Sequence, residues 1–316
     1  MSPSKSDVLS EVWRDGIFNN KVVFCTGGAG TICSVQVRAL VQLGANAAIV
    51  GRSLDKTKKV AADIAQSRSG AKVIGIGGVD VRKPESIAAA AAQCAEELGG
   101  IDFVIAGAAG NFVAPISHLS ANAFKAVVDI DLLGSFNTFK ATVPYLLRSA
   151  TRHKSINRGD LSGTGGRIIF ISATLHYSGT PFQAHVGAAK AGVDALSSSI
   201  AVEYGPMGIT SNVIAPGPIA DTEGMRRLAA DDGEQRAKNG VPLGRWGRKK
   251  EIADATVYLF SDAGNFVNGT VQVVDGAAWR LGSLASASIE YPEVLQTYLE
   301  GSPDLGSMST GAEPKL

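Results

Sequence analysis

Short apolar runs alternate with longer amphipathic stretches along most of the chain. The runs are almost continuously hydrophobic, which is typical of strands buried on both faces of a parallel sheet. The expected strands cover residues 21–25, 47–50, 72–76, 101–106, 167–172, 209–214 and 271–274. The expected helices cover about residues 31–43, 55–67, 84–98, 123–147 and 185–204. This alternation predicts an α/β protein, a doubly wound Rossmann-type parallel sheet of about seven strands with helices on both faces.

Two segments depart from the alternation, and they define the expected domain boundaries. Residues 149–166 are polar and rich in Gly and Ser, so we expect an exposed surface loop there. From about residue 281 the pattern is lost; residues 291–299 predict one short helix, and residues 301–314 are expected to be flexible. We therefore expect an N-terminal extension over 1–17, one domain over 18–280 and a C-terminal tail over 281–316.

The composition is that of a globular protein with a large core. Hydrophobic residues make up 45% and charged residues 19% of the 316 residues, which excludes a disordered chain. Lys and Arg number 30 against 29 Asp and Glu, so the net charge of +1 predicts neither nucleic acid nor a membrane as a partner. Cys25, Cys33 and Cys94 are an odd number without paired spacing, so we expect no disulfide framework, no metal site and a reducing compartment. The first residues lack the apolar core of a secretory signal, and no run reaches the ~18 apolar residues of a membrane span.

A glycine-rich turn follows the first expected strand and precedes a helix. Such a turn lets the backbone approach a pyrophosphate, and the N–H groups of the helix N-terminus then face the anion. The turn therefore predicts a dinucleotide site, although an ordinary turn between a strand and a helix would look the same. Its candidate cofactor-binding residues are Gly27, Gly28, Gly30, Thr31 and Ile32. We expect the Thr31 hydroxyl to cap the helix.

The end of the second expected strand indicates which dinucleotide binds. NAD sites place an Asp or Glu there for the ribose 2′-hydroxyl, whereas this chain has Gly51, Arg52 and Ser53. A guanidinium without a carboxylate suits a 2′-phosphate, so we expect NADPH, bound by Arg52 and Ser53. Asp80 and Val81 follow the third strand, where they can meet the adenine. The alternatives are that Arg52 is a solvated loop residue and that Asp80 and Val81 only cap the end of the third strand.

Six motifs follow one another between about residues 18 and 280. They are the TGGAG turn, Gly51-Arg52-Ser53, Asp80-Val81, Ile101-Asp102 leading into AGAAG, the helix with Lys190, and the stretch APGPI over 215–219. In this order and spacing they resemble the short-chain dehydrogenase/reductase family. The resemblance implies a nicotinamide cofactor and a homo-oligomer, either a dimer or a tetramer. It also implies further cofactor-binding residues, namely Ala108, Ala109, Gly110, Lys190, Pro216, Gly217 and Ile219.

Three positions at the expected active site depart from this family. The family works with a Ser, a Tyr and a Lys, with the Tyr four residues before the Lys; here Lys190 is present, but Val186 and Ala173 occupy the other two positions. Neither of these side chains can donate a proton, so the usual carbonyl reduction is not available from them. The family's Asn position holds Asp131, which can serve as an acid directly or through a bound water. The alternative is that Asp131 only pairs with Lys190. Asp129 lies about 200° round the helix and cannot face the same cleft.

These departures match one branch of the family. The stretches AAGNF, VVDIDLLGSFN, HVGAAKAGVDAL and APGPIADTEGMRRL resemble the peroxisomal 2,4-dienoyl-CoA reductases, and fungal members closely. The resemblance implies NADPH-dependent reduction of 2,4-dienoyl-CoA to 3-enoyl-CoA in the β-oxidation of unsaturated fatty acids. Lys190 would hold the cofactor ribose, and Asp131 would deliver a proton through water. The implied substrate-binding residues are Arg52, Arg82, Asn111, Phe112, Ser120, Asn122 and Arg227.

Three further polar residues near the expected site could have either a functional or a structural role. His185 points about 100° away from the Lys190 face and is expected to be a packed or surface histidine. His176 and Tyr177 lie in the loop after the fifth strand, where a substrate can pass. A role of either residue in the site is an alternative to simple packing.

Two alternative functions remain open, and the C-terminus carries a candidate targeting signal. One alternative is a reductase of another acyl thioester, such as a 3-ketoacyl group, which the missing Tyr disfavours. The other is a catalytically inactive nucleotide-binding scaffold, which the retained Lys190 disfavours. Pro314-Lys315-Leu316 resembles the Ser-Lys-Leu type of peroxisomal signal, which an import receptor binds. We therefore expect the peroxisomal matrix.

Overall fold

Seven parallel strands form one sheet in the computed structural model, which describes residues 3–153, 163, 165–228 and 240–281. The strand order is β3-β2-β1-β4-β5-β6-β7, so the order reverses between β1 and β4. The strands are β1 (Val22–Thr26), β2 (Asn46–Val50), β3 (Val73–Ile76), β4 (Phe103–Ala106), β5 (Arg167–Ile171), β6 (Thr210–Pro216) and β7 (Val271–Val274). This is the doubly wound sheet that the apolar runs predict, with each strand within two residues of its expected bounds.

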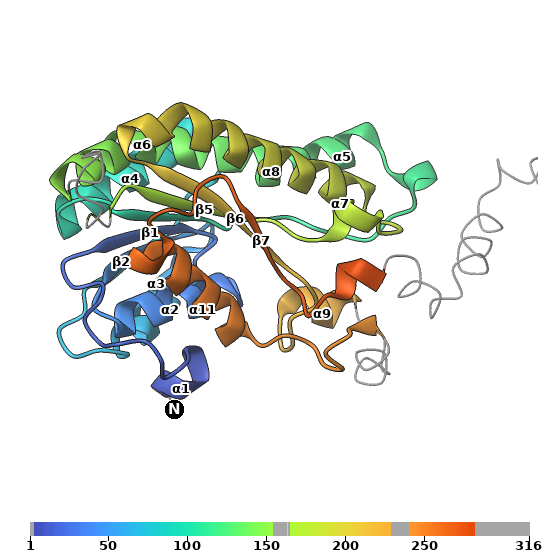
Figure 1. The fold of residues 1–316 in the computed structure, drawn as a ribbon. Helices are drawn as coiled ribbons and strands as arrows, with labels where there is room; N and C mark the ends of the chain where they lie inside the picture. The colour runs from blue at the N-terminus through green and yellow to red at the C-terminus, as the bar shows by residue number, and fades with distance from the viewer. Residues whose placement is uncertain (1–2, 154–162, 164, 229–239, 282–316) are drawn as a thin grey trace, which may run out of the picture.

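Helices cover both faces of the sheet (Figure 1). One face carries α2 (Cys33–Gln42), α3 (Leu54–Ala65) and α11 (Lys249–Phe260), and the other carries α4 (Pro84–Leu98), α5 (Ala121–Val128), α6 (Gly134–Arg152) and α8 (Ala184–Tyr204). The short elements are α1 (Lys5–Val8), α7 (Leu175–Ser178), α9 (Glu223–Leu228), the π-helical turn η2 (Asp129–Leu133) and the 3-10 turns η1 (Ile116–His118), η3 (Gly205–Met207), η4 (Asp262–Gly264) and η5 (Ala278–Leu281).

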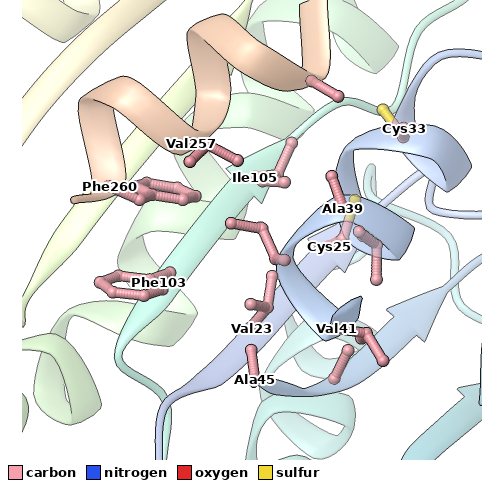
Figure 2. Packing of buried hydrophobic residues seen from close by; sticks show 14 of the residues in the cluster. Val23, Cys25, Cys33, Ala39, Val41, Ala45, Phe103, Ile105, Val257 and Phe260 are labelled. Atoms are coloured by element: carbon pink, nitrogen blue, oxygen red, sulfur yellow. The ribbon is translucent and has the colours of Figure 1, made fainter. Parts of the chain in front are cut away.

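Residues of the central strands alternate between two core layers. Val23 and Cys25 of β1 pack with α2 and α11, whereas Phe24 faces the layer that contains α4, α6 and α8. Figure 2 shows the first of these layers, in which Phe103 of β4 stacks on Phe260 of α11 with ring centroids 4.7 Å apart. Burial on both faces explains why the strands read as continuous apolar runs.

The helix expected over 123–147 is present but is interrupted by the π-helical turn η2, which separates α5 from α6. α5 ends at Val128 and α6 begins at Gly134. Asp131 lies in the middle of the turn and is fully buried. Since π-helical turns are rare and often occur at functional sites, this irregularity draws attention to Asp131.

The polar segment expected to be an exposed loop from residue 149 begins later than predicted. α6 continues to Arg152, and Ser149 is buried because its hydroxyl donates to the buried carboxylate of Asp102 at 2.5 Å. Residues 154–162 and 164 of that segment lie outside the described residues. The sequence analysis also missed α11, although the Arg248 N–H donates to Glu251 as in a helix N-terminal cap.

Residues near the N-terminus pack into the core of the domain. Val8 and Leu9 are buried in the same cluster as α2 and α11. The carboxylate of Asp254 accepts hydrogen bonds from the Ser10 N–H and hydroxyl and from the Trp13 indole, at 2.6–2.9 Å. The helix expected over 291–299 and the flexible stretch expected over 301–314 lie outside the described residues. None of the described helices has the length and apolarity needed to cross a bilayer.

Candidate active site

A cleft of about 1180 Å³ opens at the carboxyl edge of the sheet. It is lined by the loops that follow β1, β2, β3 and β4, over residues 26–33, 50–57, 79–82 and 107–113. Ligands of open parallel sheets bind at the point where the strand order reverses, and here that point lies between β1 and β4. The cleft therefore lies where the sequence analysis places the cofactor.

The glycine-rich turn forms the floor of this cleft. Gly27 has a φ of 67°, and a Cβ atom there would lie 2.6 Å from the Gly107 carbonyl oxygen. A Cβ at Gly28 would lie 2.6 Å from the Ile49 Cβ. Only glycine fits these two positions, so the turn packs closely against β2 and the loop after β4, as the glycine-rich turn of a dinucleotide site does. The residues present thus fit a dinucleotide.

The expectation that Thr31 caps the following helix is wrong. α2 begins at Cys33, its cap position is Ile32, and no side chain caps it. The Thr31 hydroxyl instead accepts a hydrogen bond from the Glu223 N–H at 3.4 Å. This contact joins the glycine-rich turn to α9, which closes one side of the cleft.

Arg52 and Lys56 bring positive charge to the wall of the cleft formed by the loop after β2. Arg52 is exposed on its wall, and Ser53 caps α3 by accepting a weak hydrogen bond from the Lys56 N–H at 3.4 Å. Asp80 is held by the Arg82 guanidinium at 2.5–3.0 Å. The hydrogen bonds from Arg82, with a smaller contribution from the Arg52 charge, lower the pKa of Asp80 to about 2. Arg82, expected to bind substrate, is thus already paired with a carboxylate.

Asp131 and Lys190 meet directly beneath the lining of the cleft. The Asp131 side chain is fully buried, and its Oδ1 accepts a hydrogen bond from the Gly110 N–H at 2.7 Å. Lys190 Nζ lies 3.0 Å from Asp131 Oδ2 and donates to the Ile171 carbonyl at 2.9 Å. One buried ion pair thereby links the loop after β4, the turn η2, the end of β5 and α8. Asp129 does not line the cleft, as expected, and it pairs with Lys125.

Positions 186 and 173, where the resemblance implies a Tyr and a Ser, hold Val and Ala. Val186 is almost fully buried and packs against Val127 and Ala189. Ala173 follows β5 directly and is half-buried. The proton donor of this site must therefore be another group.

His176 and Tyr177 form hydrogen bonds within the protein and do not line the cleft. His176 Nε2 lies 2.8 Å from Asp194 Oδ2, and the Tyr177 hydroxyl donates to the same oxygen at 2.7 Å. The Tyr177 ring also packs against Trp279 of η5. Burial and the Asp194 carboxylate raise the pKa of Tyr177, which makes this phenol a poor acid. The geometry favours a structural role, in which the cluster fixes the loop after β5.

The structure brings only part of the predicted site to the cleft. Gly27, Ala29 to Ile32, Arg52, Ser53, Asp80 to Arg82 and Ala108 to Phe112 line it, whereas the predicted residue Gly28 packs against Ile49 and does not. Ser120 caps α5, and neither Ser120 nor Asn122 is among the lining residues. Pro216 ends β6, and Gly217 and Ile219 follow it at the same edge of the sheet, but none of the three lines this cleft. The side chain of Arg227 lies outside the described part of the chain.

Several contributors to the site carry no polar signature in the sequence. Ile130 and Ile171 line the cleft, and the Ile171 main chain holds Lys190. Asp275 accepts from the Ala277 and Trp279 N–H groups at 2.8 Å, and a Cβ at Gly217 would lie 2.3 Å from the Asp275 Cβ. Backbone groups and packing contacts of this kind cannot be identified from residue types alone. The acidic residue straight after β7 is the one signal that could have pointed to Asp275.

A family model described as Enoyl-(Acyl carrier protein) reductase matches residues 27–277. The chain belongs to the short-chain dehydrogenase/reductase family. Among characterised members of this family, the peroxisomal 2,4-dienoyl-CoA reductase SPS19 [(3E)-enoyl-CoA-producing] of Saccharomyces cerevisiae is 52% identical over 90% of this chain and 92% of its own length. The peroxisomal 2,4-dienoyl-CoA reductase [(3E)-enoyl-CoA-producing] of Danio rerio is 38% identical over 85% of each chain.

Solved structures of the same family confirm the fold. A short chain dehydrogenase from Bacillus anthracis superposes with a TM-score of 0.70 at 34% identity, covering 82% of this chain and 96% of its own. A short-chain type dehydrogenase/reductase from Mycobacterium marinum gives a TM-score of 0.73 at 27% identity, covering 87% of this chain and 99% of its own. The sequence-based assignment of fold and family is therefore confirmed.

Proposed function

We propose that this protein is an NADPH-dependent 2,4-dienoyl-CoA reductase that produces 3-enoyl-CoA. The observation that carries the proposal is the buried Asp131–Lys190 pair in a site where Val186 and Ala173 replace the proton-donating Tyr and Ser. The names of the yeast and zebrafish relatives, at 52% and 38% identity, support the same activity.

The chemistry of a dienoyl thioester explains why this site needs no tyrosine. NADPH, held by the glycine-rich turn, Arg52 and Lys190, would supply a hydride to the far end of the diene, and negative charge would then develop on the thioester oxygen. Because no alkoxide forms, no phenol is needed to protonate one. The protein must stabilise the enolate-like charge and provide a proton near the carbonyl carbon.

Different residues of the cleft would bind the cofactor and the substrate. Gly27, Gly28 and Gly30 leave room for the pyrophosphate, and Arg52 would meet the 2′-phosphate. Lys190 would hold the nicotinamide ribose. Asn111 and Phe112 border the cleft beside the buried pair, where the thioester would lie. Arg82, Ser120, Asn122 and Arg227 remain proposed contacts of the CoA portion.

In this proposal Asp131 delivers its proton through a bound water, because its carboxylate does not reach the surface of the cleft. It has no exposed surface, and Gly110 and Lys190 occupy its two oxygens. The structural alternative, in which Asp131 only pairs with Lys190, requires this same ion pair. Geometry alone does not separate the two roles, whereas turnover of an Asp131 variant does.

A comparison of two substrates tests the proposed function against its rivals. NADPH oxidation is followed with a 2,4-dienoyl-CoA and with a 3-ketoacyl-CoA of the same chain length. We expect turnover with the first substrate and little with the second. The reverse preference would establish the 3-ketoacyl reductase, and NADPH binding without turnover of either substrate would establish the inactive scaffold.

Replacing Arg52 with Ala tests the preference for NADPH over NADH. A charge-assisted pair between Arg and phosphate contributes about 1.5–3 kcal/mol, so the KM for NADPH is expected to rise roughly tenfold or more. The KM for NADH should change little, because NADH lacks the phosphate. Steady-state kinetics with both cofactors measures this difference. Equal changes in the two KM values would contradict the assignment, and Lys59→Ala, an exposed cation of α3 that does not line the cleft, is the control.

The peroxisomal matrix is the proposed location. The relatives at 52% and 38% identity are named peroxisomal, and Pro314-Lys315-Leu316 resembles a receptor-binding C-terminal signal. These three residues lie outside the described part of the chain.

Deleting residues 314–316 from a fluorescently tagged protein is expected to move it from peroxisomal puncta to the cytosol. Fluorescence microscopy beside a peroxisomal marker measures the change. Substituting Pro314 with Ser, the residue of the Ser-Lys-Leu signal, should leave the puncta in place. Puncta that persist after the deletion would show that these residues are not the address.

The family resemblance also implies an acyl-CoA reductase that works as a dimer or tetramer. Phe136 on α6 and Val202 on α8 are 41% and 80% exposed, which supports contact between copies along these helices.

A further inference from the structure

His185 is a buried polar residue at the edge of the site that the proposed chemistry does not yet use. It lies in the first turn of α8, one residue before Val186, and its side chain has no exposed surface. Its ring packs on the Phe112 ring with centroids 4.2 Å apart and planes tilted by 36°. Phe112 lines the cleft and is 39% exposed, so one aromatic ring separates the imidazole from the open cleft.

Both ring nitrogens of His185 lack a hydrogen-bond partner among the described residues. The Phe112 main chain lies close enough to favour a protonated ring, but not in the geometry of a hydrogen bond. Burial outweighs this effect and the charge of Asp131, and it lowers the pKa of His185 below its usual value. The ring is therefore neutral at pH 7 and retains one N–H donor and one acceptor.

Leaving the buried N–H of His185 without a hydrogen-bond partner costs free energy, which suggests that a ligand supplies the partner. Buried polar groups are nearly always hydrogen-bonded, and leaving one unsatisfied costs about 1–3 kcal/mol. The packed histidine expected from the sequence is present, but packing alone does not explain two free nitrogens. A ligand that enters between Phe112 and the pair of Asp131 and Lys190 would supply the partner.

The proposed reaction needs a hydrogen-bond donor of the kind that His185 can provide. Hydride addition leaves negative charge on the thioester oxygen, which a preorganised donor must stabilise. Val186 and Ala173 offer no donor, and Lys190 already holds Asp131 and the Ile171 carbonyl. A neutral N–H in a water-excluded position stabilises such charge without transferring a proton to it.

We propose that the His185 ring donates a hydrogen bond to the thioester oxygen of the bound acyl-CoA and is a catalytic residue of the reduction. The proposal rests on the proposed function, because it needs a thioester whose oxygen gains charge. Phe112 turns aside or slides along the ring when the acyl group enters, and the substrate oxygen then takes the vacant donor.

The test uses two variants of the full-length protein. His185→Phe keeps a ring against Phe112 but removes both nitrogens, and His185→Gln keeps an N–H donor at similar reach. We expect His185→Phe to lower kcat by about 10²–10³-fold and to leave the dissociation constant of NADPH unchanged. His185→Gln should recover part of kcat.

A spectroscopic readout separates a direct contact from a structural role. A 2,4-dienoyl-CoA bound with NADP⁺ cannot react, and a hydrogen bond to its oxygen shifts the dienoyl absorbance to longer wavelength. We expect the shift in the wild type, its loss in His185→Phe and its partial retention in His185→Gln. His153→Phe is the matched control: this histidine contacts Asp102 and does not line the cleft, so its kcat and spectrum should stay as in the wild type.

The outcomes distinguish this proposal from the proposed function. If the wild type does not oxidise NADPH with a dienoyl-CoA, the proposed function itself is wrong. If the wild type turns over and His185→Phe keeps both its kcat and the absorbance shift, only the role of His185 is overturned. Should His185→Phe fail to fold, His185→Gln decides: a retained shift supports the donor, and a lost shift with NADPH still bound contradicts it.

Discussion

Replacing Asp131 with Asn is expected to reduce turnover by about 10²-fold or more. The amide oxygen can still accept the hydrogen bond from Gly110, but Lys190 loses its buried carboxylate partner, so the variant is also expected to be about 3–5 kcal/mol less stable. An amide cannot pass a proton to water, and protonation near the carbonyl would then become the slow step. The dissociation constant of NADPH should change by less than about twofold, because Asp131 lies beneath the cleft lining and does not form part of it.

Steady-state kinetics with a dienoyl-CoA and equilibrium titration with NADPH measure these two effects. Asp129→Asn is the matched control, since that neighbouring carboxylate pairs with Lys125 outside the site. Full activity of the Asp131 variant across the accessible pH range would show that Asp131 is structural and that the acid lies elsewhere.

Replacing Lys190 with Met is expected to destabilise the protein by about 3–5 kcal/mol, the usual effect of leaving one member of a buried ion pair alone. The Lys190 side chain is 7% exposed and that of Asp131 is 0% exposed, so water cannot replace the lost ammonium. Turnover should also be lost, because the same ammonium is proposed to hold the nicotinamide ribose.

A double variant separates the two consequences. Lys190→Met combined with Asp131→Asn removes both charges, so the free energy of unfolding should recover most of the loss while turnover does not return. Urea denaturation and NADPH oxidation measure the two quantities. If the double variant is as unstable as the single one, the ion pair is not the source of the instability.

The fold could be predicted almost completely, because the signal for a strand buried on both faces is strong. Continuous apolar runs place all seven strands within two residues. The long α5–α6 region was harder, because the break depends on one π-helical turn that leaves no mark in an amphipathic pattern. α11 was overlooked even though Glu251 in its first turn and its apolar face at Ile252 and Phe260 are ordinary helix signals.

The site was predictable where function depends on residue type and not where it depends on packing. The departures at Val186, Ala173 and Asp131 are visible in the sequence, and the Asp131–Lys190 contact follows from them. The helical angle between His185 and Lys190 placed the histidine away from the site. A helical angle does not include contacts with loops, and here the Phe112 ring, which comes from a loop, packs on the His185 ring at the border of the cleft.

Product analysis with isotopic labels tests the central claim most directly. The full-length protein is incubated with a 2,4-dienoyl-CoA and NADPH that carries deuterium at the transferred position, and separately with unlabelled NADPH in deuterated water. The proposed function predicts a 3-enoyl-CoA with cofactor deuterium at carbon 5 and solvent deuterium at carbon 2. A 2-enoyl-CoA with solvent deuterium at carbon 4, or an unreacted dienoyl-CoA beside active 3-ketoacyl reduction, would contradict it.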